Sequence, residues 1–278
     1  MSNRLRKIIL KARSQVFSEK VGNNPSVFQG EGYDFIELRE YIAGDDIKKI
    51  DWNITAKLQK PYVKVFREER EINVVLASML NGSVYFGSKK LKQELIAEIV
   101  AIVSFSALRN GDLFSSYLFA DKLYSYTRPA KKLFAVHKSV DDILEFDPIG
   151  KGSNFKTLTA TIMSRIKRKS LLVLVGDFFE IPELKVLAKK HEVLCIIVRD
   201  KLEENPPKFG FASLVDVQTG QTLEGDFNTK TVKEYAAKVH EHDHNLYNAL
   251  RKERIRFIKI YTDEDPYIKL RRLFGGRS

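Results

Sequence analysis

The sequence predicts an α/β protein built on a mainly parallel sheet with helices on both faces, preceded by a turn-rich N-terminal segment. From Glu71 onward, strand-like and helix-like segments alternate along the chain. Several strand-like segments are continuous apolar runs, such as Leu171–Val175 and Val193–Val198, which is typical of strands buried on both faces. The 278 residues, 44% of them hydrophobic, are enough to bury a sizeable core.

The first expected element is an amphipathic helix, in which apolar residues recur at helical spacing between Leu5 and Phe17. We expect it to dock on its own domain, with a membrane surface or a partner as alternatives. Turn signals follow. The later elements are, in order, strand 72–79, helix 90–108, strand 113–119, helix 130–144, helix 155–166, strand 171–175, helix 181–190, strand 193–198, linker 203–207, hairpin 214–223, helix 231–254, strand 256–261 and helix 266–274. We therefore predict an N-terminal segment, 1–70, and an α/β domain, 71–278, that ends in a hairpin-helix-strand extension.

The net charge of +11 raises the question of nucleic-acid binding. Many basic residues are scattered among acidic ones, and no basic stripe is interleaved with stacking aromatic residues. We therefore expect no nucleic-acid partner, and an acidic protein or anionic lipid headgroups account for the charge equally well. The single cysteine, Cys195, lies in an apolar run and is expected to be buried, which fits a reducing compartment. No window approaches the roughly 20 apolar residues that span a bilayer, and the N-terminus has no secretory pattern, so we expect a cytoplasmic protein.

Polar residues follow the predicted strands at the edge where an open parallel sheet binds its ligands. Asn81 and Ser83 come after the first strand of the sheet, and Asp177 comes after strand 171–175. Ser153 lies just before a predicted helix and could present its hydroxyl to the same crevice. A helix-capping role for Ser83 and Ser153, and a helix-initiating role for Asp177, are the alternatives.

The segment GYDFIELREYIAGDDIKKIDW, residues 32–52, resembles the signature of the bacterial DUF58 family. The matching residues are Gly32, Phe35, Glu37, Arg39, Tyr41, Gly44, Asp45, Asp46, Ile50, Asp51 and Trp52. The likeness continues through residues 61–62, 152–154, 176–178 and 216–220, although Lys48 or Lys49, and Lys57, stand where the family usually has Arg. The resemblance implies a von Willebrand factor A-like, Rossmann-like domain and a MoxR-type AAA+ ATPase as partner. For the location we expect the cytoplasm, with peripheral contact with the inner membrane as an alternative.

In the metal-ion-dependent adhesion site of such domains, a strand ending in Asp-x-Ser-x-Ser, a loop Thr or Ser and a later Asp hold Mg²⁺. Aligned with that pattern, Met79 stands in place of the Asp and Asn81 in place of the first Ser. A thioether is a poor ligand for Mg²⁺. The resemblance therefore implies a degenerate site in which Asn81, Ser83, Ser153 and Asp177 are residual positions. We expect no metal or other cofactor, with weak Mg²⁺ binding as the alternative.

The signature segment also contains acidic residues that could be mistaken for a catalytic pair. No base, nucleophile or phosphate-binding loop accompanies Asp45, Asp46 and Asp51, so we expect them to pair with Arg39 or Lys48 and to cap backbone amides. Trp52 is expected to be a core anchor or a surface hot spot. The candidate residues for partner binding are Arg39, Asp45, Asp46, Asp51 and Trp52.

A second metal hypothesis comes from the run His240-Glu241-His242-Asp243-His244. On a helix, His240 and His244 share a face, and with Glu241 they fit the zinc-protease pattern H-E-x-x-H. The run lies on a highly polar helix, and no third ligand stands at a convincing spacing, so we expect a solvated helix face.

The sequence as a whole predicts a protein-interaction adaptor without enzymatic activity. It would work with a MoxR-type AAA+ ATPase in assembling or activating another complex, whose client protein the sequence does not name. ATP chemistry would belong to the partner, because the chain has no G-x-x-x-x-G-K-[ST] motif. The alternatives are a Mg²⁺-dependent adhesion module with a rearranged site, a zinc hydrolase that uses His240, Glu241 and His244, and a basic protein that binds membranes or nucleic acid.

Overall fold

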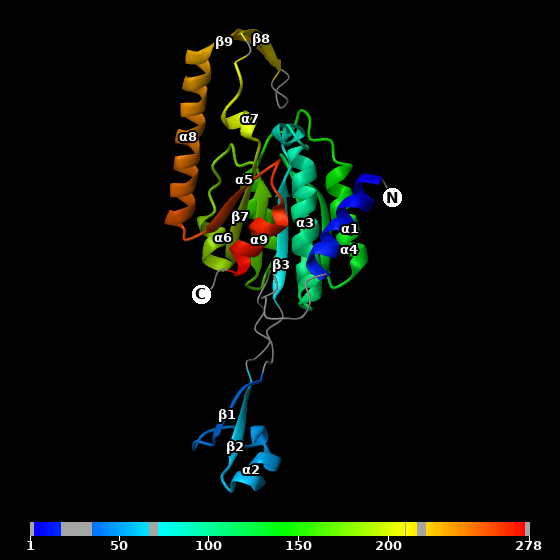
Figure 1. Ribbon diagram of the computed structural model, residues 1–278, viewed down its shortest axis with the longest axis vertical. Helices are drawn as coiled ribbons and strands as arrows, with labels where there is room; N and C mark the ends of the chain where they lie inside the picture. The colour runs from blue at the N-terminus through cyan, green and yellow to red at the C-terminus, as the bar shows by residue number, and fades with distance from the viewer. Residues whose placement is uncertain (1–2, 18–34, 67–71, 209, 216–220, 276–278) are drawn as a thin grey trace. The chain divides into compact units, whose positions relative to one another are not determined.

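The computed structural model describes residues 3–17, 35–66, 72–208, 210–215 and 221–275 (Figure 1). Contacts divide the chain into a larger unit, residues 1–28 with 73–278, and a smaller unit, residues 29–72. The predicted division at residue 70 differs from this, because the N-terminal helix belongs to the larger unit. Gly32, Glu71 and the segment 216–220, which carry some of the predictions above, lie outside the described residues.

The larger unit is built on a six-stranded sheet, and the predicted α/β fold with a mainly parallel sheet is confirmed. The strand order is β10-β7-β6-β3-β4-β5, and β5 alone runs antiparallel to its neighbour. The strands are β3 (Asn73–Met79), β4 (Leu113–Phe119), β5 (Leu123–Ala130), β6 (Leu171–Gly176), β7 (Glu192–Arg199) and β10 (Arg256–Tyr261). In β3, β4, β6 and β7 nearly every residue is buried, which is why these strands read as continuous apolar runs.

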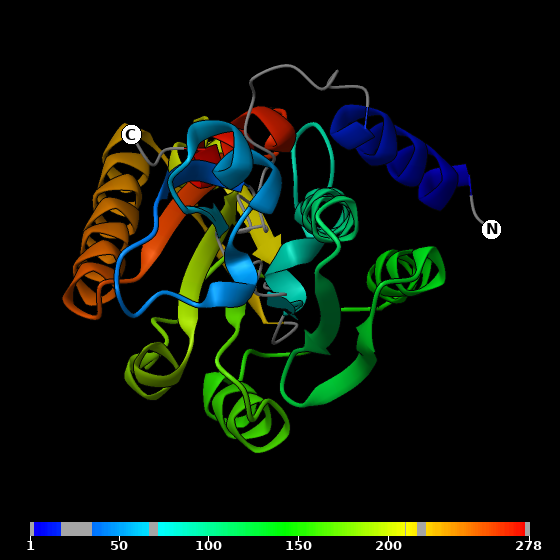
Figure 2. The ribbon, with the colours of Figure 1, turned by 90° about the horizontal axis from the view of Figure 1, so that it is seen from below.

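Helices cover both faces of this sheet (Figure 2). On one face α3 (Lys92–Arg109) is buried on almost every side, because it packs between the sheet, α1 (Asn3–Phe17), α4 (Leu133–Leu144) and α9 (Pro266–Gly275). On the other face α5 (Phe155–Arg165), α6 (Lys185–Lys190) and α8 (Thr229–Lys252) share a buried cluster with the strands. No helix among the described residues is both long and apolar enough to cross a membrane.

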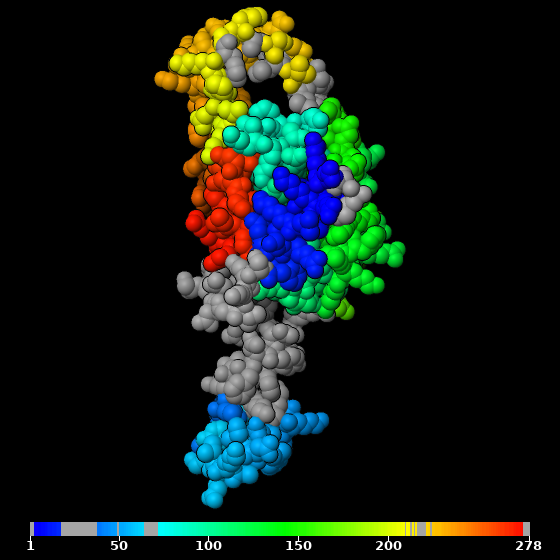
Figure 3. All heavy atoms as spheres, turned by 45° about the vertical axis from the view of Figure 1, so that its right-hand side comes forward, coloured from blue at the N-terminus to red at the C-terminus, as the bar shows by residue number. Residues whose placement is uncertain are grey.

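The N-terminal helix α1 lies on the outside of α3 and α4, as Figure 3 shows in blue. Its apolar face is buried from Leu5 to Val16. Polar contacts fix it further, because Lys11 lies 3.6 Å from Glu98 and the Arg109 guanidinium donates to the Val16 carbonyl. The helix therefore docks on its own domain, as its apolar spacing predicts.

Two parts of the larger unit differ from the predicted elements. Strand β5 was missed, and the helix expected from residue 130 begins at Leu133. The strand lies at the sheet edge and contains a proline, two features that weaken a strand pattern. The predicted linker, 203–207, overlaps the end of a short helix, α7 (Lys201–Glu204), whose capping box joins Asp200 and Glu203. The predicted hairpin is present as β8 (Gly210–Val215) and β9 (Thr222–Phe227).

The smaller unit is an antiparallel pair, β1 (Phe35–Glu40) and β2 (Tyr62–Phe66), joined by η1 (Ile47–Lys49) and α2 (Trp52–Leu58). The Arg39 guanidinium donates two hydrogen bonds of 2.7 Å to Asp45, as the sequence predicts. Asp46 and Asp51 cap η1 and α2 by accepting from backbone amides, so these carboxylates are structural. The core-anchor interpretation of Trp52 is wrong, because its side chain is 65% exposed.

Candidate functional site

The candidate site lies at the carboxyl ends of β3 and β6. The chain reverses its direction of travel across the sheet between these two strands, and open α/β sheets bind ligands at such points. Asn81 follows β3 and begins the short turn η2 (Gly82–Tyr85), which carries Ser83. Asp177 follows β6, and Ser153 comes from the loop before α5. The structure brings all four sequence-predicted side chains together.

A chain of hydrogen bonds joins the four side chains. The Asn81 amide donates to the Ser153 hydroxyl at 3.0 Å and lies 3.4 Å from the Asp177 carboxylate. The Ser83 hydroxyl is within hydrogen-bond reach of both the Asn81 carbonyl and Asp177. The helix-cap alternative for Ser153 is wrong, because Asn154 caps α5 by accepting from the Thr157 amide. The oxygens that would face a cation are therefore already engaged with one another.

Met79, which the resemblance aligns with the Asp of the adhesion-site pattern, is a packing residue. It is 2% exposed and belongs to the buried cluster that includes Phe155 and Phe178. A Cβ atom placed on Gly176 would lie 3.1 Å from the Met79 Cβ, so glycine at this position lets β3 and β6 approach closely. The thioether lies in the core and offers nothing to the crevice.

The central residue of the site is Lys92, which the sequence analysis did not select. It is the first residue of α3, and its side chain is fully buried. Its ammonium nitrogen lies 3.4 Å from the Asp177 carboxylate and donates a short hydrogen bond to Glu203 from α7. Phe179 covers the ammonium at 5.2 Å from the ring centre. A cationic side chain thus stands between two carboxylates at the end of the sheet.

The two carboxylates respond differently to this cation. Burial alone would raise the pKa of Asp177, but the Lys92 ammonium and the Ser83 hydroxyl outweigh it and hold that pKa below its ordinary value. At Glu203 burial prevails over Lys92, so the pKa of this carboxyl is raised. Asp177 is therefore ionised at neutral pH, whereas burial disfavours the ionised form of Glu203.

These residues do not fit a divalent cation. A magnesium site needs several free oxygen ligands around an open position. Here an ammonium group approaches Asp177, the hydroxyl and amide groups are joined to one another, and the position of the first carboxylate carries a thioether that faces the core. The zinc hypothesis also fails, because His240 and His244 are exposed and no metal-competent group of three His, Cys, Asp or Glu side chains occurs in the part of the chain that the structure describes.

A second buried charge network adjoins the first. Arg199, at the end of β7, is fully buried and donates to Asp243 of α8 at 2.9 Å. Lys259 of β10 contacts both Asp243, at 2.5 Å, and Glu204 of α7, at 2.6 Å. The Phe179 ring lies 3.6 Å from the Arg199 guanidinium carbon and also covers Lys92. Phe179 and α7 therefore link the two networks at one end of the sheet.

The ionisation of Asp177 predicts how stability changes in acid. Its folded-state pKa lies below the ordinary value of 3.8, so its contribution is complete above that value and is lost as the pH falls through the folded-state pKa. Asp177→Asn should therefore be less stable than the parent at neutral pH, and the difference should shrink below about pH 4. Urea unfolding of both proteins between about pH 6 and about pH 3 measures this. Glu203 is present in both proteins, and a difference that does not change with pH would contradict the assignment.

Comparison with protein families gives one match. The model described as "Protein of unknown function DUF58" matches residues 37–245, which is well over half of the chain. An uncharacterized protein of Mycobacterium tuberculosis is 23% identical over 281 residues, covering 98% of this chain and 88% of its own. An uncharacterized protein of Mycobacterium avium is 25% identical over 123 residues, covering 42% of this chain and 72% of its own.

Solved structures resemble the chain more distantly. BatB from Bacteroides thetaiotaomicron is 11% identical with a TM-score of 0.47, over 73% of this chain and 96% of that one. An aerotolerance-related membrane protein from Bacteroides fragilis is 10% identical with a TM-score of 0.44, over 73% and 98%. A von Willebrand factor type A protein from Catenulispora acidiphila is 12% identical with a TM-score of 0.39, over 75% and 43%. Similarities this distant say nothing about activity.

Proposed function

This chain belongs to the DUF58 family, and on that premise we propose that it is a protein-interaction adaptor without enzymatic activity that recognises its partner independently of divalent metal. The observation that carries the proposal is the fully buried Lys92 ammonium between Asp177 and Glu203. A cation supplied by the chain takes over the electrostatic task that a bound ion would perform at this edge of the sheet. The buried ammonium can thus hold the loops that carry the half-buried Ser83 and Ser153 in a fixed arrangement without recruiting an ion.

The proposed partner is a MoxR-type AAA+ ATPase, with which the adaptor would assemble or activate a further complex. The smaller unit supports a binding role, because Ile42, Ile47, Trp52 and Leu58 are each more than half exposed. Exposed tryptophan is frequent among the residues that dominate protein–protein binding energy. We place the protein in the cytoplasm, with peripheral contact to the inner membrane as part of the same proposal.

The described side chains support binding more than catalysis. Burial raises the pKa of the Cys195 thiol strongly, so this cysteine is not a thiolate nucleophile. The Ser83 hydroxyl contacts Asp177 and Asn81, and among the described residues no histidine hydrogen-bonds to it to accept its proton. The described part of the site therefore lacks the paired nucleophile and base that acyl transfer requires.

Metal titration tests the proposal directly. We expect calorimetry with Mg²⁺ and Mn²⁺ to show no binding up to millimolar concentrations, both in the parent protein and in Asp177→Ala. Capture of a purified MoxR-type ATPase by the adaptor should be the same with and without EDTA. Both arms are run without nucleotide, so that EDTA does not act through nucleotide-bound Mg²⁺ of the ATPase. Metal binding in the micromolar range that Asp177→Ala abolishes would overturn the metal-independent site. Failure to capture the ATPase would overturn the partner assignment alone.

A further inference from the structure

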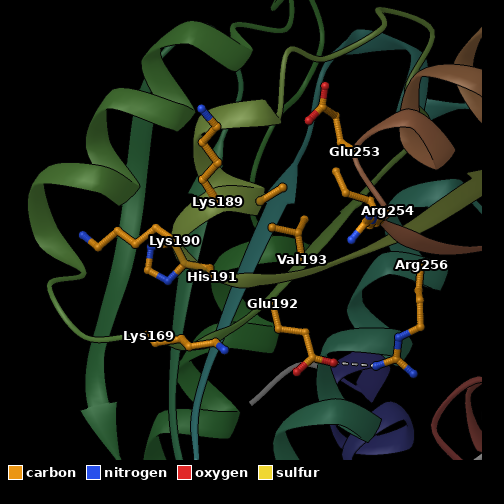
Figure 4. A pocket seen from close by; sticks show the side chains of 11 residues that line it. Lys169, Lys189, Lys190, His191, Glu192, Val193, Glu253, Arg254 and Arg256 are labelled. Carbon is orange, nitrogen blue, oxygen red and sulfur yellow. Dashed lines mark hydrogen bonds and ion pairs between the residues drawn. The ribbon is translucent and has the colours of Figure 1, made fainter.

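A pocket of about 490 Å³ lies at the opposite end of the sheet from the Lys92 site, where β7 and β10 begin. The loop before β6, the end of α6 and the end of α8 form its walls, and Figure 4 shows the side chains that line it. A volume of this size lies within the range that holds small-molecule ligands. Nothing in the proposed adaptor role uses this pocket.

The lining of the pocket is strongly basic. Five lysines and arginines face two glutamates across it. Arg256 pairs with Glu192 at 2.8 Å, and the Lys190 ammonium donates to the Ile166 carbonyl at 2.6 Å. The remaining cations, Lys169, Lys189 and Arg254, contact no acidic or carbonyl group among the described residues. The pocket therefore holds a surplus of positive charge that the described part of the chain does not neutralise.

The helix ends explain only part of this charge. Lys189 and Lys190 are in the last turn of α6, where basic residues interact favourably with the helix dipole. Lys169 lies in a loop between α5 and β6, so it has no such role. Arg254 follows the end of α8 and is likewise outside the helix. Lys169 and Arg254, both exposed, are thus the two cations of the pocket, unpaired among the described residues, that lie outside the helices.

Arg254 also occupies a backbone conformation that disfavours it. Its φ angle is +56°, in the left-handed region that glycine adopts most easily just after a helix. A non-glycine residue in this region carries backbone strain. Helix termination would be served better by glycine, which suggests that the guanidinium at this position has a separate use.

The same wall of the pocket contains the buried imidazole ring of His191. It is 3% exposed, and neither ring nitrogen has a hydrogen-bond partner among the described residues. Burial, and then the neighbouring Lys190, lower the pKa of its imidazole, so the ring is neutral and can donate one hydrogen bond. In Figure 4 the ring lies between the side chains of Lys190 and Lys169. Buried polar groups normally find a partner, and a ligand that reorders this wall would supply one.

We propose that this pocket binds a phosphate-bearing anion, held chiefly by Lys169 and Arg254. Arginine and lysine together suit phosphate, because a guanidinium offers two parallel donors and an ammonium offers a compact charge. The phosphate can belong to a soluble polyphosphate compound or to a phospholipid headgroup. Both sources share this recognition chemistry, and the experiment below distinguishes them.

The test uses the full-length protein with two probes and three variants. Inorganic pyrophosphate is titrated by calorimetry at low ionic strength, and vesicles rich in phosphatidylglycerol are used in co-sedimentation. Lys169→Gln and Arg254→Gly each remove one proposed contact, and Lys233→Gln removes an exposed lysine near the start of α8 as the matched control. We expect the first two variants to weaken binding about tenfold each and the control to leave it unchanged.

Arg254→Gly distinguishes the loss of a binding contact from a loss of folded structure. Glycine relieves the left-handed conformation, so the melting temperature should stay level or rise while binding falls. Pyrophosphate binding that depends on Lys169 and Arg254 supports a soluble ligand, and vesicle binding alone with the same dependence supports a lipid headgroup. Binding of neither probe, or equal weakening by Lys233→Gln, would overturn the site. If Arg254→Gly unfolds, Lys169→Gln decides the question.

Discussion

Replacing Lys92 by methionine should lower the free energy of unfolding by about 3–5 kcal/mol, the usual range when one partner of a buried ion pair is removed. Methionine fills a similar volume but removes the charge. Asp177, which is fully buried, and Glu203, whose side chain is 12% exposed, would then lose the cation that both of them contact. Equilibrium urea unfolding, followed by circular dichroism, measures the change.

Two further variants separate charge from packing in that experiment. Lys89→Met replaces an exposed lysine in the loop just before α3 and should change stability by less than about 0.5 kcal/mol. Adding Asp177→Asn and Glu203→Gln to Lys92→Met neutralises the site and should recover much of the loss, because a neutral hydrogen-bonded cluster carries no unpaired charge. Equal stability of Lys92→Met and the parent protein would show that the ammonium does not hold the site together.

Asp243→Asn should be the second large effect, again about 3–5 kcal/mol of lost stability. Asp243 is the acceptor for Arg199 and also contacts Lys259. Asparagine keeps the shape of the side chain but not the charge, and Arg199 would stay fully buried without its anionic partner. Thermal or urea unfolding of the variant gives the size of the loss.

The matched control for that variant is Asp263→Asn. Asp263 pairs with Lys201 at the surface, where the two side chains are 33% and 59% exposed. Solvent screens such a pair, so its loss should cost less than about 1 kcal/mol. Similar losses of stability in Asp243→Asn and Asp263→Asn would mean that burial does not increase the contribution of the Arg199–Asp243 ion pair to stability.

The sequence alone predicted the parts of the fold that have a strong local pattern. Strands 113–119 and 256–261 are found with their predicted bounds, and the buried strands β3, β6 and β7 shift by only one residue at an end. Apolar runs mark these strands because both of their faces are covered. The edge strand β5 lacks such a run, and α7 has only four residues, too few for a helical period to show.

The candidate site was predictable only in part, for a related reason. Asn81, Ser83, Ser153 and Asp177 could be grouped because each precedes or follows a recognisable element near one edge of the sheet. Lys92 and Glu203 could not be grouped with them, because these two residues pair from positions that are far apart in the sequence. In the sequence, Lys92 also cannot be told apart from its neighbours Lys89 and Lys90. The N-terminus of a helix is the positive end of its dipole, so a lysine at the first helical residue is unfavourable there. This is the local feature of the sequence that points to a specific role for Lys92.

The placement of a lysine at the end of the sheet also determines how such a protein can be controlled. An ion drawn from solution can be stripped by a chelator, exchanged for another metal or diluted when its supply falls. An ammonium that is joined covalently to α3 is present from the moment of folding and in fixed ratio to the chain. In the proposed role, recognition at this edge would not depend on the supply of an ion, and α7, which brings Glu203 onto Lys92, is the segment whose movement would change the charges there.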